Sequence, residues 1–234
     1  PPPPARAAEA ARAGGGGVAW MLATLPANSI PPAEVARWAE DEYYWGARLV
    51  RERYGHEPVY APDAPGLVHD ERLLIEPDLL ERLIALGVAR FGVITGRVRA
   101  EVDWVLPRLV AASGLAESAG SRCESWADVG FGRSPFGVIV VGEQFQKPDP
   151  AALAHAVRAL GSRGAIYAGD TRDDLHLVLR YRSELAAHDA SLPPVLAVCV
   201  ASGADAIAYR ADGADVVLRS VAALPDALAR LTLQ

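Results

Sequence analysis

Three carboxylates follow a short apolar run, Ala165 to Ala168. Asp170 comes one glycine after the run, and Asp173 and Asp174 follow within one helical turn. An apolar run this short, bounded by glycine, is typical of a buried parallel strand, and ligands bind at the carboxyl ends of such strands. Acids gathered there, with no basic run beside them, favour a hard divalent cation such as Mg²⁺. The alternative is a strand-to-helix turn in which Asp170 or Asp173 caps the helix.

A second apolar run, Phe91 to Ile94, ends in a hydroxyl residue, Thr95, which Gly96 and Arg97 follow. At the carboxyl end of a strand, a threonine hydroxyl and the next backbone N–H groups can bind one phosphoryl oxygen. Gly96 permits a close approach of the backbone, and Arg97 either reaches a ligand or stays solvated. The alternative is that Thr95 caps the following helix.

Lys147 is the only lysine of the chain and lies in the segment Gln-Lys-Pro-Asp-Pro. Pro148 and Pro150 hold it in a rigid, non-helical segment before a helix. An ammonium fixed in this way suits the neutralisation of a carboxylate or a phosphate, and Asp174 is a candidate to orient it. A surface lysine in a proline-rich turn is the alternative, which the absence of other lysines makes less attractive.

Five apolar runs alternate with helical segments in the second part of the chain, residues 71–234. This alternation predicts an α/β fold with a Rossmann-like parallel sheet of about five strands and helices on both faces. The expected strands are residues 91–95, 136–141, 165–168, 195–200 and 215–218. Residues 116–135 are expected to be a Gly/Ser-rich loop.

The first part of the chain, residues 1–70, has no strand signal. It opens with low-complexity sequence up to residue 17. A helix is expected from Pro31 to about Tyr54, with Gly55 as its C-cap, and a linker rich in Pro and Gly follows. We therefore expect a small helical module at 1–70 and the α/β core at 71–234.

In this order, the three motifs resemble the second, third and fourth motifs of the haloacid dehalogenase superfamily of phosphohydrolases. The resemblance covers roughly residues 72–230, and the helical front end resembles that family's α-helical cap. It implies a Mg²⁺-dependent phosphatase that acts on a small phosphorylated metabolite through an aspartyl-phosphate. The implied roles are phosphate binding by Thr95 with Gly96 and Arg97, catalysis by Lys147 and Asp174, and Mg²⁺ binding by Asp170 and Asp173. Asp173 is also a less favoured substitute for Asp174 as the supporting acid.

The family's first motif, Asp-x-Asp on an apolar strand, is missing: no two aspartates among the 234 residues are separated by one residue. The early apolar run Val18 to Leu22 is not followed by an acid. Without the nucleophile the covalent route is closed, Mg²⁺ binding is expected to be weak or absent, and the acids of residues 170–174 should repel one another and have raised pKa values. The missing strand should be the centre of the sheet.

Two interpretations fit these residues: an N-terminally incomplete phosphatase, or a catalytically inactive relative that binds a phosphorylated ligand or a partner protein. A plain Rossmann nucleotide binder is weaker, because no Gly-x-Gly-x-x-Gly opens a helix. The net charge of −6 and the absence of a Lys/Arg-rich run argue against nucleic acid. No apolar run approaches the roughly 18 residues that span a bilayer. With two distant cysteines and no signal peptide, we expect a cytoplasmic protein; its oligomeric state is not indicated.

Overall fold

The computed structural model describes residues 38–58, 62–115, 125–126, 131–133 and 135–232. The low-complexity opening, the run Val18 to Leu22 and the expected helix start at Pro31 lie outside these residues, as does most of the 116–135 segment. The chain divides into two compact units, Pro1–Arg72 and Leu73–Gln234. Within the described ranges, no helix is long and apolar enough to cross a membrane.

The described part of the first unit is helical. It holds the π-helix η1 (Trp38–Trp45), α4 (Gly46–Tyr54) and the short 3₁₀ turn η2 (Leu67–His69). The helix expected up to Tyr54 is interrupted at Gly46, whose φ is +77°. A Cβ at Gly46 would lie 2.5 Å from the backbone nitrogen of Gly66, so only glycine fits there. Gly55 ends α4 in the left-handed conformation, which confirms the predicted C-cap.

The second unit contains the five expected strands. They are β1 (Phe91–Ile94), β4 (Phe136–Val140), β5 (Ala165–Gly169), β6 (Val195–Val200) and β7 (Val216–Leu218). All their pairings are parallel, but they form two sheets, β1-β4 and β5-β6-β7, rather than the single sheet expected. A short antiparallel pair, β2 (Ser125–Trp126) and β3 (Phe131–Arg133), lies in the segment expected to be a loop. The protein is therefore of the α/β class with parallel sheets.

Helices separate the strands. They are α5 (Pro77–Ala85), α6 (Arg99–Ser113), α8 (Pro150–Ala159), α9 (Arg172–Arg180) continued by the π-helix η5 (Tyr181–Ala186), α10 (Gly203–Ala211), the 3₁₀ turn η6 (Val221–Ala223) and α11 (Leu224–Thr232). Helix α10 was not predicted, because four of its nine residues are alanine and it begins with glycine, so its apolar periodicity is weak.

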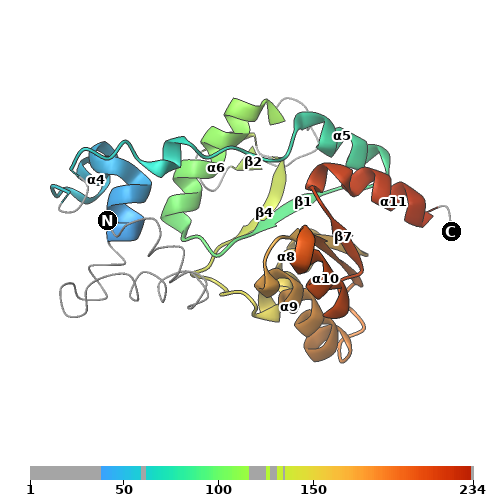
Figure 1. Ribbon diagram of the computed structural model, residues 1–234. Coiled ribbons are helices and arrows are strands. Elements are labelled where there is room, and N and C mark those ends of the chain that lie inside the picture. The colour runs from blue at the N-terminus through green and yellow to red at the C-terminus, as the bar shows by residue number, and fades with distance from the viewer. Residues whose placement is uncertain (1–37, 59–61, 116–124, 127–130, 134, 233–234) are drawn as a thin grey trace. The chain divides into compact units, whose positions relative to one another are not determined.

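Two apolar clusters lie on opposite faces of the strands. Residues of α8, α9, η5 and α10 build the first cluster, and residues of α5, α6 and α11 build the second (Figure 1). Tyr167 of β5 and Ile94 of β1 pack against the first cluster. Ile166 of β5 and Val93 of β1 pack against the second. Each cluster thus spans both sheets, so the strands of both sheets form one layer between two layers of helices.

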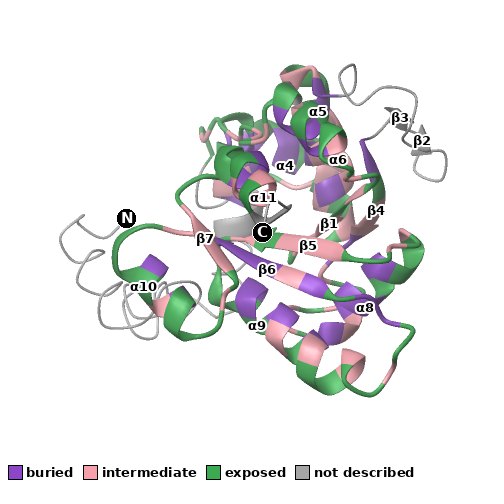
Figure 2. Ribbon diagram, turned by 90° about the vertical axis from the view of Figure 1, so that its right-hand side faces the viewer, coloured by how far each residue is buried: buried purple, intermediate pink, exposed green. Residues whose placement is uncertain are grey.

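Burial is uneven within this layer. Strand β6 is mostly buried, whereas no residue of β1 or β5 is fully buried (Figure 2). Strands covered by helices on both faces are normally the most buried part of an α/β fold. The partial exposure of β1 and β5 therefore arises at their edges, since each pairs with another strand on one edge only.

Candidate functional site

The turn between β5 and α9 is built around the carboxylate of Asp174. Thr171 is the N-cap of α9, and its Oγ1 accepts the N–H of Asp174 at 3.2 Å. In return, Asp174 Oδ2 accepts the backbone N–H of Thr171 at 3.1 Å and its hydroxyl at 2.7 Å. This reciprocal arrangement is a capping box. The alternative in which Asp170 or Asp173 caps the helix is therefore wrong, because Thr171 fills that role.

The other oxygen of the same carboxylate binds an ammonium and a phenol. Asp174 Oδ1 accepts from Lys147 Nζ at 2.8 Å and from the Tyr167 hydroxyl at 2.6 Å. Asp174 is 4% exposed and the Lys147 side chain 19% exposed, so the ion pair is largely shielded from water. The structure thus brings together Lys147 and Asp174, which come from two separate motifs. Since both oxygens of Asp174 are occupied, its role here is to position the ammonium.

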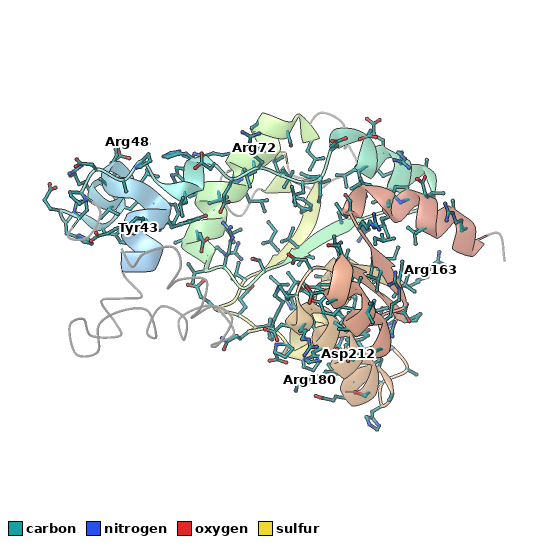
Figure 3. All side chains as sticks on the ribbon, viewed as in Figure 1. Tyr43, Arg48, Arg72, Arg163, Arg180 and Asp212 are labelled. Atoms are coloured by element: carbon teal, nitrogen blue, oxygen red, sulfur yellow. The ribbon has the colours of Figure 1, made fainter. Side chains whose placement is uncertain are left out.

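The segment that carries Lys147 is itself held in place on both sides. Arg180, labelled in Figure 3, donates to the carbonyl oxygen of Pro148 at 3.2 Å and pairs with Glu184 on the next turn. Asp149 is the N-cap of α8 and accepts the N–H of Ala151 at 2.9 Å. The aspartate of the Lys-Pro-Asp-Pro motif therefore caps a helix.

Hydrogen bonds control the charge on Asp174. Burial would raise the pKa of its carboxyl, but the hydrogen bonds from Lys147, Tyr167 and Thr171 outweigh burial and lower the pKa below the ordinary 3.8. The expectation that the acids of this turn have raised pKa values is therefore wrong for Asp174. The physical reason is that Lys147, 27 residues away in the sequence, compensates its charge.

Tyr167 is a site residue that the sequence analysis missed. Burial, and then the negative charge of Asp174 beside it, raise the pKa of its phenol, so it stays protonated and donates to Asp174. Its position in the middle of an apolar strand could have indicated this role, because a buried phenol needs an acceptor for its O–H group.

Asp170 and Asp173 lie apart from this network. Both are exposed, and their carboxylates make no hydrogen bond or ion pair with any residue in the described ranges. The backbone oxygen of Asp170 accepts the hydroxyl of Tyr209 at 3.0 Å, which ties the end of β5 to α10. The Asp170 carboxylate is thus available to a ligand at the carboxyl end of β5.

Thr95 lies at the carboxyl end of β1. Its N–H donates to Val140 O at 2.9 Å, and its Oγ1 accepts the N–H of Arg97 at 3.2 Å. Helix α6 has Val98 at its N-cap position, so the alternative in which Thr95 caps this helix is wrong. A carboxylate from the loop after β4, Glu143 Oε2, instead accepts the N–H of Arg99 at 2.6 Å. The Thr95 hydroxyl keeps a proton that a ligand oxygen can accept.

The loops after β1 and β4 touch through two glycines. A Cβ on Gly142 would lie 2.4 Å from Gly96 O, whereas a Cβ on Gly96 would meet nothing within 4 Å. The close approach expected of Gly96 is therefore made possible by Gly142, and open space remains beside Gly96. Arg97 forms an ion pair with Glu101 at 3.0 Å, one turn into α6. Lys147 belongs to the same loop as Gly142, so the motif around Lys147 adjoins the motif around Thr95 and Gly96.

The carboxylates of the described chain do not make a complete Mg²⁺ site. Magnesium needs several oxygen ligands in octahedral geometry. No group of three or more His, Cys, Asp or Glu side chains suited to a metal occurs among the residues that the structure describes. Both oxygens of Asp174 are taken by donors, which leaves the exposed pair Asp170 and Asp173. A metal held here would need further ligands that these residues do not supply.

No protein-family model matches the chain, and no curated protein matches it. An X-ray structure of a Northeast Structural Genomics Consortium target is similar to it, at 16% sequence identity and a TM-score of 0.49. The similarity covers 91% of this chain and 54% of the other, so this chain spans about half the length of that structure.

We expect Gly169→Ala to disrupt the site. A Cβ at Gly169 would lie 2.4 Å from the Cβ and the Cγ of Asp174, so the capping box or the strand must shift. Gly164→Ala is the matched control, since its added Cβ would meet its nearest neighbour, Pro194 O, at 4.0 Å. Urea unfolding should show a loss of about 1–3 kcal/mol for Gly169→Ala and little change for Gly164→Ala. Equal stabilities of the two variants would contradict this packing.

We expect the Asp174 carboxylate to make folding dependent on pH in the acid range. Because its pKa is lowered on folding, it contributes stability above the ordinary value of 3.8 and loses this contribution as the pH falls toward the lowered value. Asp174→Asn should be less stable at pH 7 by about 1.5–3 kcal/mol and lose less stability below pH 4. Urea midpoints from pH 7 to pH 2.5 measure both. Parallel pH profiles for the two proteins would contradict the assignment; Asp173→Asn, on the exposed side of the same turn, is the control.

Proposed function

We propose that this chain is the phosphate-binding core of a Mg²⁺-dependent phosphohydrolase of the haloacid dehalogenase type, acting on a small phosphorylated metabolite. The observation that carries the proposal is the ion pair between Lys147 and Asp174, 2.8 Å between Nζ and Oδ1. Two motifs that resemble separate signatures of that family meet at this contact, at the carboxyl end of a parallel strand, where α/β folds place their ligands.

In this proposal each residue of the site has a defined role. The Lys147 ammonium neutralises a phosphoryl oxygen, and Asp174 and Tyr167 fix its position without touching the ligand. The Thr95 hydroxyl donates to the phosphoryl group, and the open space beside Gly96 admits it. The exposed carboxylate of Asp170 is the part of the site that would face a divalent cation, which supplies charge neutralisation when bound.

The part that cleaves the phosphate ester is missing from the sequence. Covalent hydrolysis needs a carboxylate nucleophile, and no Asp-x-Asp pair occurs among the 234 residues. These residues therefore bind a phosphoryl group without turning it over. A second candidate, an inactive relative that binds a phosphorylated ligand or a partner protein, is favoured by one observation: Asp174, the implied catalytic acid, has all of its described contacts in a structural network.

We expect no hydrolysis of p-nitrophenyl phosphate by these 234 residues in the presence of Mg²⁺, because the nucleophile is lacking. Release of p-nitrophenolate, followed at 405 nm, should equal the buffer blank. The result that overturns this expectation is turnover that Asp170→Ala abolishes and Asp205→Ala, an exposed carboxylate on α10, leaves intact.

We expect inorganic phosphate to bind next to Lys147. Reductive methylation with ¹³C-formaldehyde labels this single lysine and keeps its charge, which gives one side-chain NMR signal besides the chain terminus. Phosphate should shift that signal in a saturable way, and chloride at equal ionic strength should not. Thr95→Val should weaken binding by about tenfold, the loss of one hydrogen bond to a charged group, and Thr95→Ser should restore it. A signal that phosphate leaves unmoved rejects the proposed site.

A further inference from the structure

A pocket of about 300 Å³ lies at the carboxyl ends of β6 and β7, where α10 packs against β7 (Figure 2). Its lining comes from the residues that follow β6, from β7 and from one face of α10, and includes Ser202, Val217, Arg210 and Arg219. Two of the residues that line this pocket are arginines, and none of them is acidic. We call it the arginine pocket.

The two arginines reach the pocket from opposite sides. Side chains alternate along a strand, so Arg219, directly after β7, continues the face of Val217, which packs on the α10 side of the strand. On α10, Gly203, Ala206 and Arg210 are spaced by three and four residues and therefore share one face of the helix. The strand and the helix thus each contribute one guanidinium group to the same small space.

Neither guanidinium group has an acidic partner in the described ranges. Arg210 donates to the carbonyl oxygen of Ala206 in its own helix at 3.3 Å, and Arg219 makes no hydrogen bond or ion pair there. Asp205, the acid in the first turn of α10, lies on the helix face of Tyr209, four residues on. Burial, and then the negative charge of Asp205, raise the pKa of the Tyr209 phenol, which agrees with this placement.

Two positive charges that line one small pocket repel each other unless an anion lies between them. A guanidinium group presents its donors as a planar fork that matches the oxygens of a phosphate in a bidentate manner. The hydroxyl of Ser202 makes no capping bond to α10 and is a further donor, and the dipole of α10 adds positive potential at the same end. The donors present therefore suit a compact oxyanion.

The place of the pocket in the fold suits a ligand that is separate from the one proposed at Lys147. Ligands of parallel α/β sheets bind at the carboxyl ends of the strands. The strand order β5-β6-β7 places the end of β7 two strands, about 10 Å, from the end of β5, whose turn carries Asp174. One phosphate ion cannot bind at both places.

We propose that Arg210 and Arg219 form a second anion-binding site, which holds a phosphoryl group between their two guanidinium groups. The volume of the pocket is at the lower end of the range for small-molecule sites, so the ligand is phosphate itself or a small phosphate ester. This inference rests on the arginine pocket and does not depend on the proposed function.

The test follows both guanidinium groups by NMR of the whole chain labelled with ¹⁵N-arginine. The Nε–Hε signals are assigned from their loss in Arg210→Gln, Arg219→Gln and Arg163→Gln. Inorganic phosphate should shift the Arg210 and Arg219 signals along one common saturation curve, and sodium chloride at equal ionic strength should not. Arg163, labelled in Figure 3, is the control, because it is exposed just before β5, at the opposite ends of the strands.

The variant Arg219→Gln removes one of the two forks. The Kd for phosphate, read from the Arg210 signal, should rise at least about tenfold, because charge-assisted hydrogen bonds are lost. Arg163→Gln removes the same charge elsewhere and should leave this Kd unchanged. Since Arg219 has no partner to lose in the described ranges, the thermal midpoint of Arg219→Gln should not fall.

Glycerol phosphate distinguishes the two sources of the phosphoryl group. Tighter binding than that of inorganic phosphate assigns the pocket to a phosphate ester, and equal or weaker binding assigns it to free phosphate. The methylated Lys147 signal reports on the other site and should respond to phosphate equally in Arg219→Gln and in the unchanged protein. If Lys147 does not respond while the arginines do, the proposed phosphohydrolase site is rejected and the arginine pocket stands.

Four results overturn the proposal. The first is the absence of a phosphate response at Arg210 and Arg219. The second is an equal response at Arg163, which would indicate screening by bulk ions. The third is an unchanged response of Arg210 in Arg219→Gln. The fourth is a weaker Lys147 response in that variant, which would indicate one shared site.

Discussion

The two apolar clusters hold the second unit together, because no backbone ladder joins its two sheets in the part of the chain that the structure describes. Each cluster takes alternate residues of β1 and β5 and packs them against the same layer of helices. The position of β1 relative to β5 thus depends on side-chain packing, together with side-chain hydrogen bonds such as Arg90 to Leu160 O and Lys147 to Asp174. The contact between the loop that carries Lys147 and the turn that carries Asp174 is made across the two sheets that this packing holds together.

Asp174 shows how this fold turns a destabilising group into a structural one. A buried carboxylate is costly unless it is paired and fully hydrogen-bonded. Here one carboxylate joins the N-terminus of α9, the middle of β5 and the loop before α8. The same contacts make the ammonium of Lys147 rigid, so positioning of that charge and stability of the turn depend on the same atoms. A site built in this way has little freedom to adapt to a ligand, which suits a small anion of fixed geometry.

The sequence predicted local structure better than pairing. All five strands were found from apolar runs bounded by glycine or proline, and Gly55 was found as a helix end. The split into two sheets was not predictable. The apolar residues of β1 and β5 are equally compatible with a strand paired on both edges and with a strand paired on one edge only. The link between Lys147 and Asp174 was proposed from the residue types and their motifs, but its electrostatic effect was not, and the pKa shift expected for Asp174 had the wrong sign. Tyr167 was missed because the pattern of apolar residues along a strand does not show which acceptor a tyrosine hydroxyl reaches.

The open edges of β1 and β5 also bear on how the protein behaves in solution. Neither strand contains a charge or a proline, the residues with which natural sheets protect their edges from pairing with another copy. Helices α5, α8, η5 and α11 line the space beside these edges but leave both strands partly exposed. Any change that loosens one helix layer exposes two uncharged strand edges at once. Loosening of a helix layer is therefore expected to promote aggregation through these edges.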